Sequence, residues 1–312
     1  MMWLVYAALA AVCFGMRGIL YHWTSQKPID RNTMLLGVYL CGALIAGVFA
    51  LLLHQEWSPG VWMGLSMGLF SYISNAAMFR GFAVGKASLV AICTALTPLV
   101  VVGISYGLWN ETLTFPQTAA LIVILAGIVM IRYSNDISLR NLKGVHWALL
   151  AMLTFGLTDV SSKQAMLWNA DKLPTLFVMY ATGSVLFFLS WYRNVLSTVK
   201  GAKLSGSRNE IAATLEASDL RAREEQERPA RWSTGRTLFV GMAVGLSNIS
   251  GMMLILPAFE LGVTGLVSAI VATSVLLILL YARFVLKEVW SVLELIGIFT
   301  TIAGVLILRL LG

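Results

Sequence analysis

The sequence predicts an all-α integral membrane protein whose ten transmembrane helices form two five-helix inverted repeats. Three observations lead to this prediction: the composition, the spacing of long apolar runs, and an internal duplication. Of the 312 residues, 58% are hydrophobic and only 12% are charged, and the mean hydropathy is +0.82. Soluble chains carry about twice this share of charged residues. The composition therefore excludes a soluble enzyme, a disordered chain and a disulfide scaffold.

Ten runs are long enough to cross a bilayer, which takes about 20 mostly apolar residues. They cover residues 2–21, 34–54, 60–80, 86–108, 115–133, 146–167, 174–194, 236–259, 263–284 and 289–310. The first run lacks the positive start of a signal peptide, so we interpret it as a true span. Pro98 lies inside the fourth run and is predicted to free a backbone carbonyl and kink that helix.

The duplication appears as two registers of self-similarity. Glycines and charged residues match at a shift of 177 residues, as in the pairs Gly64/Gly241, Gly68/Gly245, Glu111/Glu288 and Arg132/Arg309. The front of each half matches at a shift of 141 residues, as in the pairs Phe14/Phe155, Gly15/Gly156, Tyr39/Tyr180 and Gly42/Gly183. Apolar identities alone would be weak support, but glycines and charges in one register are not explained by composition.

The two registers divide the chain into repeats. We expect a first repeat at 1–133, an inter-repeat loop at 134–145 and a second repeat at 146–312 that contains a polar insert at 197–234. Because each repeat has an odd number of spans, the halves cross the membrane in opposite senses. This plan is typical of carriers, whose site lies between the halves. The two Gly-x-x-x-Gly pairs are predicted to allow close helix contact.

Each half resembles an EamA repeat of the drug/metabolite transporter superfamily. The resemblance rests on a Phe-Gly pair in the first span, a Gly-rich third span, and the stretches FRGFAVGKASLV, ALTPLVVVGISYGLWNETLT, LILLYARFVLKEVW, ILAGIVMI and TIAGVLIL. It implies the fold of a ten-helix carrier but no particular substrate, because the family carries amino acids, sugars, amines and drugs. One departure is Val275, which stands where the first half has Pro98.

We therefore expect a secondary transporter that moves a small organic metabolite, amino acid-like or amphiphilic, by alternating access, with export as the direction. An intramembrane enzyme and a channel-like facilitator are the alternatives, but the sequence has no metal-ligand spacing, nucleophile motif or pore loop. No cofactor is expected. The expected partners are the substrate, a proton or counter-substrate, and the lipid bilayer, with no nucleic acid; the chain is a monomer or homodimer.

The distribution of basic residues predicts the orientation. The loops after odd-numbered spans hold 18 Lys and Arg, whereas the termini and the other loops hold 3. The positive-inside rule then places the odd loops and the insert at 197–234 in the cytoplasm, and both termini outside a bacterial inner membrane. The family resemblance implies cytoplasmic termini instead; the orientation predicted here follows the charges.

Two charged side chains lie within predicted spans, where ionisable residues are costly and usually functional. Arg17 and Asp159 each follow the Phe-Gly pair of their half, so the duplication places them at nearly the same level. Either they contact the substrate, or they neutralise each other as a structural ion pair. Lys163, one turn after Asp159, is predicted to reach the membrane surface or to pair with Asp159.

The other candidate substrate-binding residues are polar or aromatic side chains within spans, several at matched depths: Tyr39, Tyr72, Asn75, Thr94, Thr97, Tyr180, Asn248 and Ser274. The tyrosines suit stacking on an organic substrate, with core packing as the alternative. The amides and hydroxyls suit cavity lining, with interhelical bonds or bonds to their own helix as the alternatives. Glu111 and Glu288 are predicted to be structural, each at a helix N-terminus.

Overall fold

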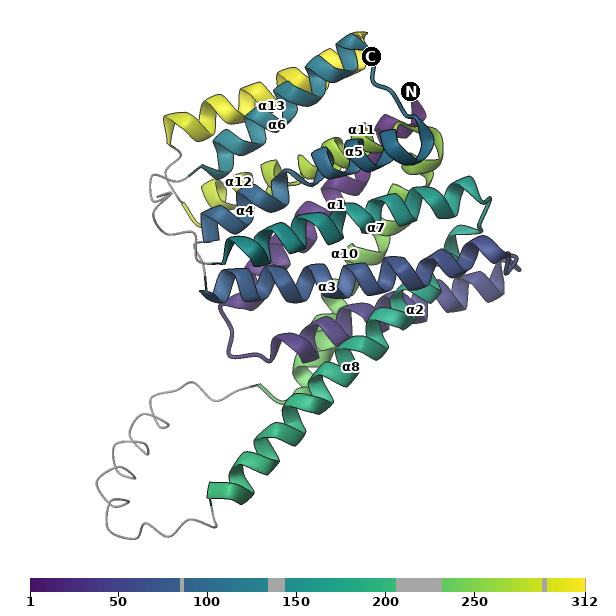
Figure 1. The fold of residues 1–312 in the computed structure, drawn as a ribbon. Helices are drawn as coiled ribbons and strands as arrows, with labels where there is room; N and C mark the ends of the chain where they lie inside the picture. Colours follow the sequence, from purple (N-terminus) through teal and green to yellow (C-terminus); the bar gives the residue numbers. More distant parts are fainter. Residues whose placement is uncertain (85–86, 134–143, 206–231, 288–290, 312) are drawn as a thin grey trace.

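The structure is a computed structural model that describes residues 1–84, 87–133, 144–205, 232–287 and 291–311 (Figure 1). The first half contains α1 (Met2–Ser25), α2 (Arg31–Leu52), a 3-10 turn (Pro59–Trp62), α3 (Met63–Val84), α4 (Ala87–Ala95), α5 (Thr97–Trp109) and α6 (Phe115–Arg132). The second half contains α7 (Val145–Leu167), α8 (Lys172–Ser205), α10 (Thr234–Leu261), α11 (Thr264–Ala272), α12 (Val275–Phe284) and α13 (Val292–Leu311).

These helices follow the order of the ten predicted spans and confirm the all-α membrane fold class. The fourth span is split into α4 and α5, and the ninth into α11 and α12. Both termini lie at the same end of the bundle (Figure 1), as an even number of crossings requires. Within the described residues, eight segments are apolar and long enough to cross a membrane by composition alone. The remaining two spans, α3 and α7, pack against each other.

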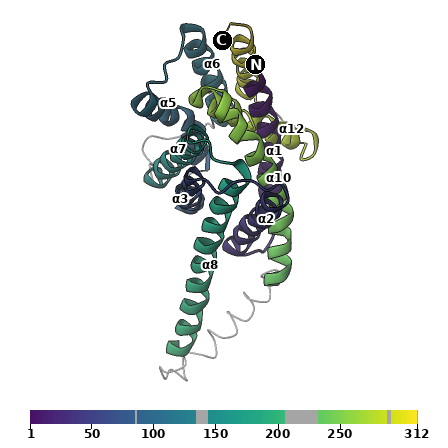
Figure 2. The ribbon, with the colours of Figure 1, turned by 90° about the vertical axis from the view of Figure 1, so that its right-hand side faces the viewer.

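The packing of one half repeats that of the other with the partners exchanged. Helix α1 packs on α10 as α7 packs on α3, and α2 packs on α10 as α8 packs on α3. Two pairs of equivalent helices pack on each other: α2 packs on α8, and α6 packs on α13 at one edge of the bundle (Figures 1 and 2). This exchange is what two inverted repeats produce.

The Gly-x-x-x-Gly pairs allow these helices to touch through their backbones. A methyl group added to Gly68 of α3 would lie 2.5 Å from the carbonyl oxygen of Met179 in α8. The equivalent addition to Gly245 of α10 would lie 2.8 Å from the carbonyl oxygen of Val38 in α2. Both distances are far below van der Waals contact, so the predicted structural role of these glycines is confirmed.

The break in the fourth span follows from its proline. Pro98 has no N–H to offer the carbonyl of Thr94, four residues earlier. The Thr97 hydroxyl donates to that carbonyl oxygen at 2.7 Å instead. The side chain therefore replaces the lost backbone bond, and the chain passes from α4 to α5 through Leu96.

The ninth span, predicted at 263–284, is broken at the equivalent place although it has no proline there. The Thr273 hydroxyl donates to the carbonyl oxygen of Ile270 at 2.6 Å. The Ser274 N–H binds the carbonyl oxygen of Val271 at 3.0 Å, a tighter turn than in an α-helix. A tight turn with a hydroxyl hydrogen bond thus breaks the span in the second half, as Pro98 breaks the equivalent span in the first half.

Lys163 neither reaches the surface nor pairs with Asp159, contrary to both predictions. Its side chain is buried, and Nζ donates to the carbonyl oxygens of Phe259 at 2.8 Å and Gly262 at 3.0 Å, at the end of α10. Nζ also lies 3.3 Å from a Glu111 carboxylate oxygen. Glu111 is structural as predicted, but its carboxylate accepts the N–H of Thr264 at 3.0 Å, so it caps α11 rather than its own helix.

Helix α8 extends well past the predicted end of its span at residue 194. It continues to Ser205 and projects beyond the rest of the bundle (Figures 1 and 2). The first part of the insert at 197–234 is therefore a continuation of α8. Residues 206–231 of the insert, Glu288 and most of the inter-repeat loop lie outside the described residues.

Replacing Gly68 by Ala should weaken the fold. The added methyl group must push α3 away from α8, and overpacking of this kind costs about 1–3 kcal/mol. Thermal unfolding of the purified protein in detergent measures the effect. Gly103→Ala is the matched control, because a methyl group there meets nothing within 4 Å. Equal melting temperatures for the two variants would contradict the close packing of α3 on α8.

Replacing Lys163 by Met should destabilise the protein by about 3–5 kcal/mol, because Glu111 and two helix-end carbonyls would lose a buried cation. Lys172→Met removes a comparable ion pair that is exposed, with side chains 38% and 46% accessible for Lys172 and Glu260. That control should cost no more than about 1 kcal/mol. The same unfolding assay compares them, and a small effect of Lys163→Met would refute the structural role of the network.

Candidate functional site

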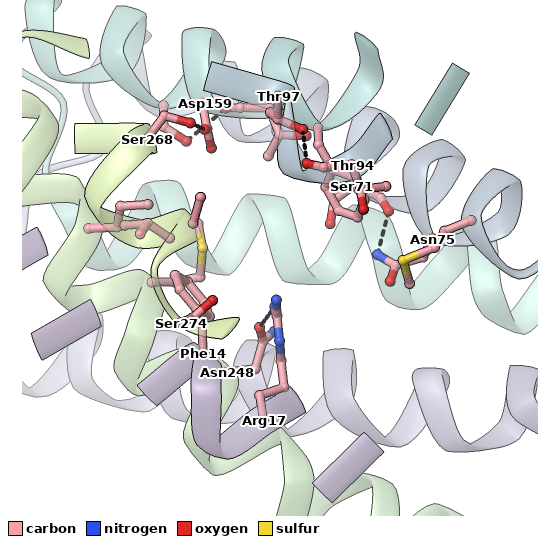
Figure 3. Close-up of a pocket in the computed structure, with 18 of the residues that line it drawn as sticks. Phe14, Arg17, Ser71, Asn75, Thr94, Thr97, Asp159, Asn248, Ser268 and Ser274 are labelled. Carbon is pink, nitrogen blue, oxygen red and sulfur yellow. Dashed lines mark hydrogen bonds between the residues drawn. The ribbon is translucent and has the colours of Figure 1, made fainter. Parts of the chain in front are cut away.

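A cavity of about 250 Å³ lies between the two halves of the bundle (Figure 3). It is lined mainly by the first, third, fourth, sixth, eighth and ninth spans; α2, α6 and α8 each add one residue, namely Tyr39, Arg132 and Met179. Eight of the ten candidate residues line it: Arg17, Tyr39, Asn75, Thr94, Thr97, Asp159, Asn248 and Ser274. The duplicated helices thus bring residues from both ends of the sequence to one place.

Two tyrosines pack reciprocally where the halves meet. The rings of Tyr39 and Tyr180 lie 5.6 Å apart between centroids, in an edge-to-face arrangement at 67°. The Tyr39 ring fills the space beside Gly183, and the Tyr180 ring fills the space beside Gly42. Both rings are buried. Each half therefore supplies a ring for the other half's glycine, and neither glycine could carry a side chain.

The tyrosine hydroxyls bond to the third span of their own repeat. The Tyr39 hydroxyl is hydrogen-bonded to the Ser71 hydroxyl, and the Tyr180 hydroxyl accepts Nδ2 of Asn248 at 3.0 Å. Ser71 and Asn248 occupy equivalent positions at the shift of 177 residues. The same hydrogen bond is therefore made twice, with a hydroxyl partner in the first half and an amide partner in the second.

The amide partner orients Arg17. Oδ1 of Asn248 accepts Nη1 of Arg17 at 2.5 Å, and the guanidinium lies 4.6 Å from the ring centroid of Phe14. The ring of Tyr21 lies 5.8 Å away, so a neutral acceptor and two aromatic rings surround the guanidinium and supply no counter-ion. Because a guanidinium has five N–H donors, others remain for a ligand. Tyr180 lies behind Asn248, outside the cavity lining, and supports it.

Asp159 lies across the cavity from Arg17 (Figure 3). Its Oδ2 accepts the Ser268 hydroxyl at 2.7 Å. No ion pair joins Asp159 to Arg17 among the described residues; the ion pairs there involve Lys163 and Lys172. In this conformation the two opposite charges therefore face the same space, each held by a neutral polar partner.

The remaining polar candidates bond mainly to their own helices, which was the alternative expectation for them. Nδ2 of Asn75 donates to the carbonyl oxygen of Ser71 at 2.7 Å. The Thr94 hydroxyl donates to the carbonyl oxygen of Val90 at 3.0 Å. Both residues also line the cavity, and their side-chain oxygens can accept hydrogen bonds. Tyr72, predicted as a substrate contact, is outside the lining and packs edge-on against another aromatic ring, that of Phe187, at 4.9 Å.

Sequence reasoning missed Arg132 and Ser268. Arg132 was counted with a cytoplasmic loop, but it lies in the last turn of α6 and its side chain lines the cavity. Ser268 is one hydroxyl in an apolar run, and no spacing links it to Asp159. Tertiary packing alone brings both residues to the site. Within the described residues, no group of three His, Cys, Asp or Glu is placed to hold a metal ion.

Comparisons with known proteins agree with this architecture. Twenty-nine chains of solved structures are similar. One of them, titled "Crystal structure of protein", has a TM-score of 0.69 at 16% identity, over 99% of this chain and 96% of that chain. This likeness shows the fold across both halves. The comparison with curated proteins gave no match.

Residues 1–133, which are the predicted first repeat, match the family described as "EamA-like transporter family". The match confirms the resemblance seen in the sequence, and with the apolar helices it indicates a multi-pass membrane transporter of small molecules. Residues 1–133 of this chain are therefore similar to the EamA-like transporter family, as the resemblance in the sequence implied.

Proposed function

We propose that the protein is a secondary transporter that moves an amino acid-like metabolite across the membrane by alternating access. The observation that carries the proposal is that Arg17 and Asp159 face one cavity without pairing, each bound to a neutral side chain. A guanidinium holds a carboxylate through its planar fork, and a carboxylate accepts an ammonium group. Opposite charges across one cavity therefore complement a zwitterion.

The size of the cavity favours a small substrate. Its volume is about 250 Å³, below the range of about 300–1,000 Å³ found for pockets that hold drug-sized ligands. A bulky drug or a long amphiphile would not be enclosed in this conformation. An amino acid, which is small and carries both charges, suits the volume and the polarity of the cavity.

Alternating access is supported by the helices that line the cavity. Discontinuous helices at the interface of inverted repeats are typical of carriers that rock around a central site. Here the breaks between α4 and α5 and between α11 and α12 both border the cavity through Thr97 and Ser274. The coupling ion and the direction of transport, expected to be export, stay predictions.

Neutralising either charge should strongly reduce transport without unfolding the protein. Each loss removes a charge-assisted hydrogen bond to the substrate, so Arg17→Gln and Asp159→Asn should each reduce transport roughly 10- to 100-fold. A thermal-shift screen of amino acids, amines, nucleosides and drugs first identifies the substrate. Transport is then measured in proteoliposomes, with melting temperature as the check of folding.

The double variant and an exposed control complete this test. Lys172→Met removes a charge outside the cavity and should transport as the unchanged protein does. The double variant of Arg17 and Asp159 should be inactive. Full transport by that double variant would mean that the two charges neutralise each other structurally, and the proposed site would be wrong.

We also propose that the insert at 197–234 faces the cytoplasm, following the positive-inside rule. In a background with Cys13, Cys41 and Cys93 replaced by Ala, a cysteine at Ser207 should not react with a membrane-impermeant maleimide added to intact cells. A cysteine at Glu56, which is exposed at the opposite end of the bundle, should react. The reverse pattern would invert the orientation.

A further inference from the structure

The cavity holds one more charge than a zwitterion explains. The charged residues of its lining are Arg17, Arg132 and Asp159. If a substrate carboxylate meets Arg17 and a substrate ammonium meets Asp159, the guanidinium of Arg132 still lacks a counter-ion. A charge left unpaired in a membrane interior is costly, and it is usually retained for a function.

Arg132 has no polar partner in the part of the chain that the structure describes. No hydrogen bond or ion pair joins it to the described residues, and its Nε is shielded from solvent without an acceptor. This contrasts with Lys163, a buried cation that has two carbonyl oxygens and the Glu111 carboxylate within 3.3 Å. The fold therefore satisfies Lys163 internally, whereas Arg132 lines the cavity with its Nε unsatisfied.

The residue of the second half that is equivalent to Arg132 shows that an arginine at this position need not line the cavity. Arg309 matches Arg132 in the duplication and also lies in the last turn of its helix. It is exposed, and it is absent from the lining of the central cavity. In both helices a basic residue in the last turn interacts favourably with the helix dipole. Only Arg132, in α6, also lines the central cavity.

We infer that Arg132 is a second anion-binding residue of the cavity, so that the substrate carries two anionic groups and one ammonium group, as an acidic amino acid does. This rests on the proposed function of the Arg17 and Asp159 pair and narrows its substrate class. One anionic group binds Arg17, the ammonium group binds Asp159, and the second anionic group binds Arg132. The three charges of the substrate then balance the three charges of the lining.

Binding to the purified full-length protein tests the inference with two sets of ligands. L-Aspartate, L-glutamate and O-phospho-L-serine carry the second anionic group, whereas L-alanine and L-serine lack it. The unchanged protein should bind the first set more tightly. Arg132→Gln should weaken binding of that set roughly 10- to 100-fold, as loss of a charge-assisted bond predicts, and should leave binding of the second set unchanged.

Two further variants separate the site from general effects of charge. Arg309→Gln removes the equivalent charge outside the cavity and should change neither set. Arg132→Lys keeps the charge but not the planar fork, so it should weaken binding of the acidic set less than Arg132→Gln does. It also serves as the test variant if Arg132→Gln does not give folded protein, as judged by gel filtration and melting temperature.

The outcomes distinguish this inference from the proposed function. Equal affinity for both sets, or acidic ligands that bind Arg132→Gln and Arg132→Lys as tightly as the unchanged protein, would overturn the role of Arg132. The proposed function would survive that result if Arg17→Gln still weakened binding of both sets. If neither set bound, or if Arg17→Gln changed neither, the proposed function and this inference would both be wrong.

Discussion

The reciprocal packing of Tyr39 and Tyr180 against Gly183 and Gly42 is the contact on which the site depends. Each ring occupies space that exists because the other half has a glycine there. The constraint is symmetric, so a side chain at either glycine would push α2 and α8 apart. Because α2 also packs on α10, and α8 on α3, a shift of this contact would reach the helices that carry the polar residues of the cavity.

Polar bonds extend from this contact to the charged groups. Tyr180 bonds Asn248, and Asn248 bonds Arg17, so a buried ring in the interface sets the position of a guanidinium in the cavity. The Tyr39 hydroxyl bonds instead to the Ser71 hydroxyl and to Nδ2 of Asn75 at 3.4 Å, and within the described residues neither partner bonds to a charged side chain. The two halves are therefore alike in backbone and different in chemistry, and this asymmetry lets one cavity present opposite charges on opposite walls.

Charged groups inside the bundle fall into two kinds. Lys163 and Glu111 satisfy each other and the backbone groups at the ends of α10 and α11, which are orphaned at any helix terminus. Their role is to join the sixth and ninth spans to the turn before α6. Arg17 and Asp159 have one neutral side-chain partner each. The contrast between satisfied and unsatisfied charge separates structural groups from candidate binding groups.

Much of the fold could be predicted from the sequence, because apolar length, glycine spacing and the duplication are properties of the chain itself. They determined ten spans, the inverted repeats, and the placing of Arg17 and Asp159 near one level. The tertiary structure decided the rest. The turn at Thr273 breaks the ninth span without a proline. Lys163 donates to carbonyl oxygens 96 and 99 residues away in the sequence. Arg132 lines the cavity, whereas the equivalent Arg309 does not. Such outcomes depend on which helix lies beside which side chain, and neither hydropathy nor spacing encodes that information locally.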